Sequence, residues 1–128
     1  MLSFGIVTDK QQLMEIEHTP EACTKSLMAV RDTLDVLNGK WKLPIIIALD
    51  SGPKRFNELE RMITGITPKL LSKELRDLEA NEFITRTVYP TTPVKIEYAL
   101  TGYSGTLSRV IAEMRDWGIQ HRKKITGR

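Results

Sequence analysis

Four polar residues recur at helical spacing in the middle of the chain: Lys69, Ser72, Lys73 and Arg76. Positions separated by three, four and seven residues fall on one side of an α-helix, so these side chains form one polar stripe. Lysine and arginine neutralise phosphates, arginine can also donate two hydrogen bonds to a guanine edge, and a serine hydroxyl can serve a base or a phosphate. The stripe predicts DNA binding, although a solvated surface helix would carry a similar pattern.

The helix that carries the stripe is predicted to run from Pro68 to about Asn81. Thr67 suits its N-cap, proline is favoured at the first helical position, and asparagine can end a helix. Three leucines spaced i, i+4 and i+7 form its core side, with Leu70 at their flank: Leu71, Leu75 and Leu78. The acidic residues are expected to lie mostly off the polar stripe: Glu74, Asp77 and Glu79.

Three helices are predicted before this one. The first spans residues 24–37, where apolar residues recur at helical spacing. The second begins near Trp41, because Pro44 fits only in a first turn, and its apolar run predicts burial on most sides. The third spans residues 56–63, and a tight connection containing Gly65 follows it. Two basic residues before the third helix could reach a phosphate: Lys54 and Arg55.

The periodicity changes after this group of helices. Residues 83–89 and 95–100 alternate as β-strands do, and the prolines between them suit a loop. We expect a β-hairpin that packs on the helices, because two strands alone are only marginally stable. Arg86 and Lys95 are further candidates for DNA contacts.

A last helix is predicted over residues 106–122, followed by a frayed basic tail at 123–128. Its apolar stripe has five members: Leu107, Val110, Ile111, Met114 and Trp117. Residues 1–20 are expected to form an N-terminal arm, in which a short helix at 11–17 would end at Pro20. The intervening residues 21–122 are expected to form one domain.

The expected fold class is therefore α+β and mostly helical, a winged helix-turn-helix with added N- and C-terminal helices. In this motif the second helix of the pair enters the major groove and the hairpin lies along the DNA backbone. The stripe helix is then the reading helix, and Thr67 at its start joins the predicted DNA contacts.

Composition agrees with a soluble cytoplasmic protein. The 128 residues are 41% hydrophobic and 27% charged, as in an ordinary single domain. The longest apolar run is Leu43–Leu49, far short of the roughly 20 residues that span a membrane. The net charge of +3 is uneven: residues 40–76 hold eight basic and four acidic residues, whereas residues 1–39 hold three and six. This asymmetry is typical of a protein with a polyanionic partner, although a solvated basic face would give the same charge pattern.

An enzyme or a metal protein is not expected. The two histidines, His18 and His121, and the single Cys23 match no common catalytic or metal-ligand spacing. His18 and Cys23 could form a nucleophile–base pair, but no oxyanion donors accompany them. No cofactor, no metal and no membrane contact is expected.

Several segments together resemble the HxlR-type transcriptional regulators, winged-helix proteins related to the MarR regulators. The matching pieces are Cys23, GKW at 39–41, RFNEL at 55–59, GITPKLLSKELRDLE at 65–79, TRTVYPTTPVKIEYALT at 85–101 and Trp117-Gly118. The resemblance implies a homodimer on a two-fold-related DNA operator. It also implies that the first and last helices build the dimer interface, with Leu27 and Val30 joining the stripe of the last helix.

The resemblance also bears on regulation. Some family members sense oxidants or electrophiles through an N-terminal cysteine, and Cys23 occupies that place. A thiol at the start of a helix can be activated by the helix dipole, while an inert, partly buried cysteine is the alternative. A small-molecule effector is a further expectation. One departure concerns Ser104, because the family usually has glycine there, and the last helix is expected to begin differently.

A winged-helix module for protein–protein interaction, without DNA binding, is the competing hypothesis. Winged helices serve both purposes, and a fold does not fix a function. A protein-binding surface should expose apolar anchors, and the polar stripe contains none.

Overall fold

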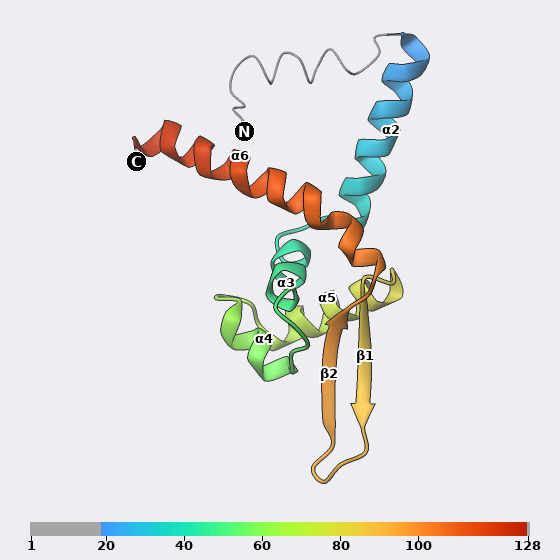
Figure 1. Cartoon of the computed structure of the whole chain (residues 1–128), viewed down its shortest axis with the longest axis vertical. Helices are drawn as coiled ribbons and strands as arrows, with labels where there is room; N and C mark the ends of the chain where they lie inside the picture. The colour runs from blue at the N-terminus through green and yellow to red at the C-terminus, as the bar shows by residue number, and fades with distance from the viewer. Residues whose placement is uncertain (1–18, 128) are drawn as a thin grey trace. The chain divides into compact units, whose positions relative to one another are not determined.

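The computed structural model describes residues 19–127, which form two units divided between Asn38 and Gly39. In the first unit the described residues form helix α2, Pro20–Val36. The second unit contains helices α3 (Lys42–Leu49), α4 (Phe56–Met62) and α5 (Pro68–Ala80), strands β1 (Ile84–Tyr89) and β2 (Lys95–Leu100), the 3₁₀ turn η1 (Tyr103–Leu107) and helix α6 (Ser108–Thr126) (Figure 1). This content confirms the predicted fold class.

Helix α2 begins at the proline that was expected to end a helix. Thr19 caps it, because its Oγ1 accepts a hydrogen bond from the Ala22 amide at 3.1 Å. Pro20 therefore occupies the first turn, where its missing amide proton costs nothing, and the predicted start at residue 24 is wrong. The short helix expected at 11–17 lies outside the described residues. No residue of α2 is buried within this chain.

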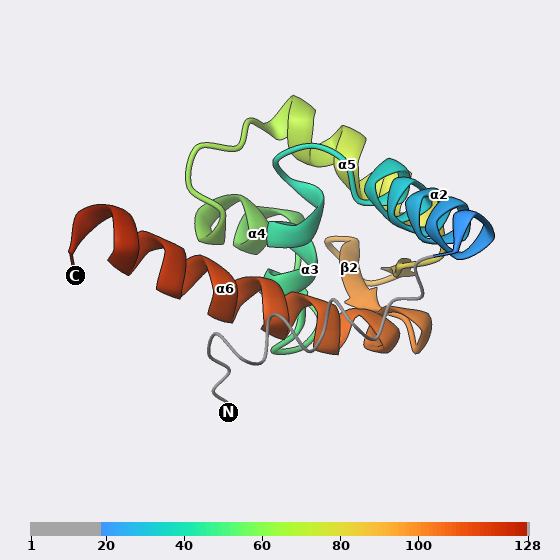
Figure 2. The same cartoon turned by 90° about the horizontal axis from the view of Figure 1, so that it is seen from above.

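The core of the second unit lies where α3 packs against both α4 and α5 (Figure 2). Its largest fully buried side chains come from three helices and the first strand: Ile45, Leu49, Leu59, Leu71, Leu75, Leu78 and Ile84. The apolar run of α3 is buried on most sides as predicted, except for Ile47, which is 54% exposed. The predicted bounds of α4 and α5 are confirmed to within one residue.

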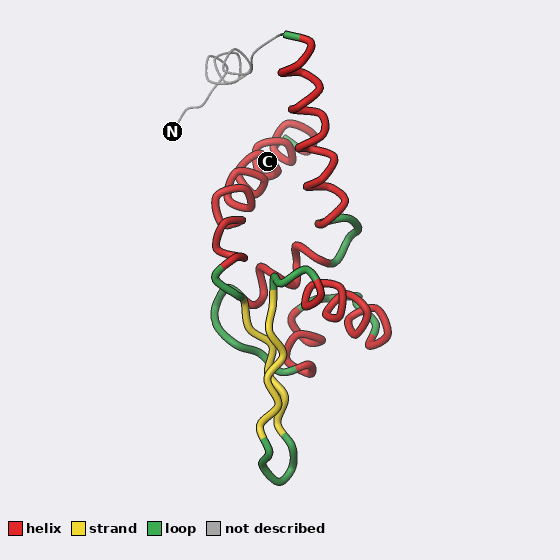
Figure 3. Tube along the Cα trace, turned by 90° about the vertical axis from the view of Figure 1, so that its right-hand side faces the viewer, coloured by secondary structure: helices red, strands yellow, loops and turns green. Residues whose placement is uncertain are grey.

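The two strands pair in antiparallel register, from Ile84 opposite Leu100 to Tyr89 opposite Lys95. Figure 3 shows them side by side up to the loop at their far end. Lys54 adds a short third segment to the sheet, because its amide and carbonyl bond the carbonyl and amide of Tyr98 at 2.9 and 2.8 Å. The predicted hairpin is thus confirmed, and the segment before α4 anchors its second strand.

The connection into α6 depends on Ser104, the departure noted in the sequence. This residue is buried, its hydroxyl donates to the Phe83 carbonyl, and its amide donates to the Thr101 carbonyl at 3.1 Å. The hydroxyl therefore has a buried partner that a glycine could not supply. A 3₁₀ turn follows, so α6 begins at Ser108 and not at residue 106.

The predicted end of α6 is also wrong, because the helix continues beyond residue 122 to Thr126. Gly127 closes it in the left-handed conformation, with φ of +76° and its amide bonded to the Lys123 carbonyl at 2.7 Å. Lys123 and Lys124 lie in the last turn, where positive charge favours the helix C-terminus. The tail expected to fray is therefore helical up to this cap.

The turn after α5 holds a backbone conformation that its residue disfavours. Asn81 ends the helix as predicted, but its φ is −92°, and the left-handed residue is Glu82 with φ of +65°. The Glu82 amide bonds the Glu79 carbonyl and the Phe83 amide bonds the Leu78 carbonyl, so this geometry closes α5. A side chain with a Cβ is strained at such a position, whereas glycine is not.

We predict that Glu82→Gly raises the free energy of unfolding by roughly 0.5–1 kcal/mol, because relief of the left-handed strain exceeds the extra chain entropy of glycine. Urea denaturation at fixed protein concentration measures the change. Glu82→Ala is the matched control, since it removes the carboxylate but keeps the Cβ, and we expect little gain from it. Equal gains in both variants would assign the effect to charge instead of backbone strain.

Candidate nucleic-acid interface

The turn between α4 and α5 fixes where the candidate reading helix begins. The Ile66 amide bonds the Ile63 carbonyl at 3.3 Å, and Gly65 has φ of +91°, which favours glycine. Thr67 then caps α5, because its Oγ1 accepts from the Leu70 amide at 3.2 Å. The Thr67 cap and the glycine turn therefore set the first turn of α5 through contacts within a few residues, as the sequence predicts.

The two sides of α5 separate as expected. Leu71, Leu75 and Leu78 are buried, while Leu70 beside them is 37% exposed. The polar stripe faces outward: Lys69, Lys73 and Arg76 are exposed and Ser72 is half-buried. Burial of the leucines thus presents the stripe to solvent.

Sequence reasoning missed a buried ion pair behind α5. Lys42, in the first turn of α3, is 5% exposed, and its Nζ lies 2.5 Å from Oε1 of Glu74, which is 7% exposed. The same ammonium lies 3.5 Å from Oδ2 of Asp77. The helical spacing did indicate that Glu74 is buried, because position 74 falls between Leu71 and Leu78 on the core side of the helix. Its partner, Lys42, lies on another helix, and no local sequence pattern predicts that pairing.

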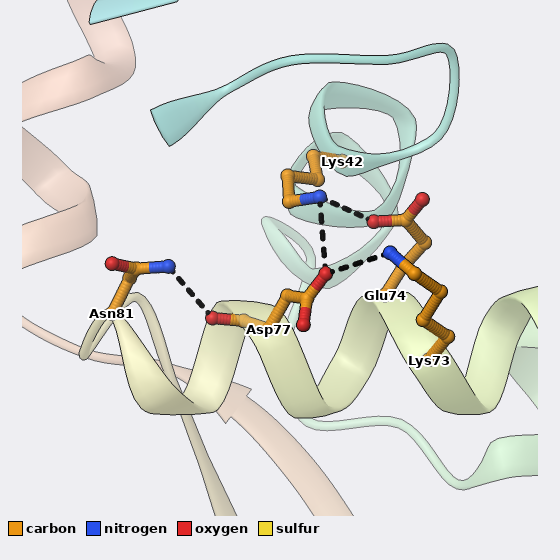
Figure 4. A network of polar contacts seen from close by, with 5 residues as sticks. All are labelled: Lys42, Lys73, Glu74, Asp77 and Asn81. Atoms are coloured by element: carbon orange, nitrogen blue, oxygen red, sulfur yellow. Dashed lines mark hydrogen bonds and ion pairs between the residues drawn. The ribbon is translucent and has the colours of Figure 1, made fainter. Parts of the chain in front are cut away.

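Two cations of the stripe are held by neighbours one turn away. Lys73 donates to Oδ2 of Asp77 at 3.0 Å, and Arg76 donates to Oγ of Ser72 at 2.8 Å. Asp77 was expected to lie mostly off the polar stripe, and its bond to Lys73 was not predicted. Figure 4 shows that Asp77 lies between the buried Lys42 and the exposed Lys73.

These contacts shift two pKa values. The hydrogen bond to Asp77 and the charge of that carboxylate raise the pKa of Lys73 above its ordinary value, with a further contribution from Glu74. The hydrogen bond from Lys73 lowers the pKa of Asp77, and the charges of Lys73 and Lys42 act in the same direction. Both groups therefore stay ionised over the physiological range.

Two candidate arginines line a shallow hollow of about 390 Å³ between α5 and the hairpin. Arg76 comes from α5 and Arg86 from β1, and the remaining lining residues are Ser72, Leu75, Glu79 and Tyr98. The hollow thus joins a residue of the predicted stripe with one of the predicted wing. No pattern in the sequence indicated that these two arginines line one hollow.

Two of the other basic candidates, Lys54 and Lys95, have side-chain partners within the chain. Lys54 donates from Nζ to Oγ of Ser51 at 3.0 Å and to the Gly52 carbonyl at 3.2 Å. Lys95 lies 3.3 Å from Oε2 of Glu97 and over the Tyr89 ring, 5.2 Å from its centroid. Arg55 is exposed, and its amide donates to Oε1 of Glu58 at 2.8 Å. Arg55 is thus the more accessible of the two candidates before α4.

Helices α2 and α6 each expose an apolar face. On α2, Leu27, Val30 and Leu34 are exposed, and Cys23, four residues before Leu27, lies on the same side. Of the five residues predicted for the apolar stripe of the last helix, Leu107 lies in η1 and is half-buried, and the other four lie on α6. Their exposure ranges from half-buried Ile111 to Trp117, which is 67% exposed. The α6 face extends further than predicted, to His121 and to the exposed Ile125. The His121 ring stacks on the Trp117 ring, with ring centroids 4.8 Å apart.

Within residues 19–127, no three His, Cys, Asp or Glu side chains gather in a way that could hold a metal ion. His18, a candidate partner of Cys23, lies outside this range. In the same part of the chain, no helix has the length and apolar character needed to cross a membrane.

Comparison with known proteins identifies the family. The model described as HxlR-like helix-turn-helix matches residues 36–126. The chain belongs to this family. It is 43% identical over 96 residues to the uncharacterized HTH-type transcriptional regulator YdeP of Bacillus subtilis, with 75% of each chain covered. It is 34% identical over 111 residues to YtfH of Escherichia coli, which carries the same description, with 87% of this chain and 84% of YtfH covered.

Solved structures of two regulators share the fold. The redox regulator HypR in its reduced form superposes with a TM-score of 0.73 at 39% identity, covering 78% of this chain and 99% of HypR. The reduced form of the transcriptional regulator YodB from B. subtilis superposes with a TM-score of 0.65 at 36% identity, covering 81% of this chain and 94% of YodB. The predicted family and fold are thereby confirmed.

The lowered pKa of Asp77 predicts a specific loss of stability in acid. Because the folded-state pKa lies below the ordinary 3.8, the unfolded chain takes up a proton first as the pH falls. The contribution of Asp77 is therefore complete above the ordinary pKa and disappears as the pH falls through the lowered value. We expect wild type to exceed Asp77→Asn in stability at pH 7 and the difference to shrink towards pH 3.

Thermal unfolding at a series of pH values measures this difference. The control repeats the comparison in a Lys73→Met background, where the principal cause of the shift is gone and the pH dependence should weaken. A difference that stays constant from pH 7 to pH 3 would contradict the prediction.

Proposed function

We propose that this protein is a transcriptional regulator that binds double-stranded DNA as a homodimer on a two-fold-related operator. The observation that carries the proposal is the exposed polar stripe on α5, the second helix of a helix-turn-helix whose opposite side is fixed in the core. A helix with its cationic side free can enter the major groove and donate to phosphates and base edges. The family of transcriptional regulators to which the chain belongs supports this assignment.

In this proposal DNA is contacted by the polar stripe, by the hairpin and by the segment before α4. Thr67, Lys69, Ser72, Lys73 and Arg76 contact DNA from α5. Arg86 and Lys95 contact it from the hairpin, and Arg55 and Lys54 from the segment before α4. Since Arg76 and Arg86 border one hollow, a phosphate there could accept from both. The combined contacts would make binding strongly dependent on salt.

The homodimer would form through the apolar faces of α2 and α6. Exposed residues such as Leu27, Val30, Met114 and Trp117 need a partner surface in water, and a second copy of the chain provides the same faces. A dimer would place two reading helices roughly 34–36 Å apart, one turn of DNA. Such a regulator would act in the cytoplasm.

Regulation is proposed to act through Cys23 or a small molecule. The thiol is exposed, lies in the first turn of α2, and shares a side with the residues proposed to form the dimer interface. HypR is named a redox regulator and was solved in reduced and oxidised forms, and YodB was solved reduced and diamide-treated. Modification of Cys23 would change the packing at the interface and hence the spacing of the reading helices.

In-vitro selection from random duplex DNA at two salt concentrations tests the proposal. We expect an enriched inverted repeat with half-sites about 10 base pairs apart, bound more weakly at high salt. No enriched sequence with either reduced or oxidised protein would favour the competing hypothesis of a protein-interaction module.

We predict that Arg76→Ala weakens operator binding by about tenfold or more, because arginine contacts to DNA are among the strongest in such interfaces. The fold should be unaffected, since the side chain is exposed. Electrophoretic mobility shift or fluorescence anisotropy measures affinity. Arg109→Ala, an exposed arginine on α6, is the matched control and should bind as wild type does. Equal binding by both variants would place the interface on another face.

We predict that diamide lowers the operator affinity of wild type and that a thiol reductant restores it. Cys23→Ser should bind as reduced wild type does and should not respond to diamide, because the chain contains no second cysteine. An unchanged diamide response in Cys23→Ser would remove the thiol from the mechanism. That result would leave the DNA-binding assignment intact.

A further inference from the structure

Asp77 connects the core of the second unit to the candidate reading surface. Its Oδ2 lies 3.0 Å from the exposed Nζ of Lys73 and 3.5 Å from the buried Nζ of Lys42 (Figure 4). Its main-chain carbonyl also accepts from Nδ2 of Asn81 at 3.0 Å. A single carboxylate oxygen therefore lies between a cation inside the fold and a cation of the polar stripe.

Lys42 contacts α5 at two points, one helical turn apart. Glu74 and Asp77 are three residues apart on the helix, and both carboxylates point at the same ammonium. Apolar contacts resist separation of two helices but are nearly indifferent to small rotations, whereas hydrogen bonds to two carboxylates are directional. Two such contacts therefore fix the rotation of α5 about its own axis relative to α3.

Rotation of α5 decides where the stripe points. A side chain that reads a base edge must be placed within a fraction of an ångström, while a side chain that only neutralises phosphates tolerates displacement. Lys73 and Arg76 are both held by bonds along α5. Of these two bonds, the one to Lys73 ends on a residue that Lys42 also contacts.

We propose that Lys42 is a positioning residue for sequence recognition, which orients α5 and, through Asp77, the ammonium of Lys73. This inference rests on the proposed DNA-binding function. Lys42 itself is buried and does not contact DNA. Its effect should appear in the discrimination between operator and other sequences, and not in general affinity for DNA.

Replacement of the buried pair by apolar residues separates positioning from stability. Lys42→Met/Glu74→Leu removes one positive and one negative charge, so the net charge and general attraction to phosphates are unchanged. Apolar replacement of a buried ion pair is often neutral or stabilising, so the variant should fold. The matched control is Arg115→Gln/Asp116→Asn, which removes the exposed pair at 3.0 Å on α6 with the same charge balance.

The experiment compares affinities for the selected operator and for a scrambled duplex in each variant. For Lys42→Met/Glu74→Leu we expect the ratio of the two affinities to fall about threefold to tenfold, with unchanged affinity for scrambled DNA. Asp77→Asn should lower the same ratio. In the triple variant the ratio should fall by no more than the larger of the two separate falls, because both changes interrupt the same set of contacts. The α6 control should keep the wild-type ratio.

The outcomes are distinguishable. A wild-type ratio in Lys42→Met/Glu74→Leu, or losses that simply multiply in the triple variant, would overturn the positioning role and leave the DNA-binding function standing. Absence of any preference in wild type would overturn the proposed function, and this inference with it. Urea denaturation of each variant shows whether a fall in the ratio comes from unfolding instead.

Discussion

The fold of the second unit depends on the burial of one side of α5. Leu71, Leu75 and Leu78 fill the space beside α3 and β1, and each is at most 2% exposed. Because a helix repeats every 3.6 residues, burial of these three leucines also determines, to within a small rotation, which residues face outward. The polar stripe is therefore a geometric consequence of core packing, and its chemistry can vary without disturbing the fold.

Local signals in the sequence were sufficient for most elements of this unit. Thr67 and Pro68 mark the start of α5 through a side-chain cap and a restricted dihedral angle, and both act within one turn. The strands follow from alternation and from the prolines between them. The chain beyond residue 122 was mispredicted because Gly127 was not recognised as a helix cap, although that signal is also local.

The remaining features of the site depend on residues distant in the sequence. Glu74 is buried only because Lys42 of α3 lies opposite it, and a buried charge without such a partner would be strongly unfavourable. The hollow between Arg76 and Arg86 likewise requires β1 to lie beside α5. Helical periodicity placed each of these side chains on a side of its own element, but it carries no information about the neighbouring element.

The short pairing between Lys54 and Tyr98 has a consequence for how the second unit opens. The two residues close a loop of chain that contains α4, α5 and β1 entirely. A segment enclosed in this way cannot detach by fraying from a chain end, so its release requires the closing pair or the core to break first. Amide protons of α5 should therefore exchange with solvent as one cooperative group together with those of β2. The candidate reading helix would be among the last parts of this unit to lose its structure.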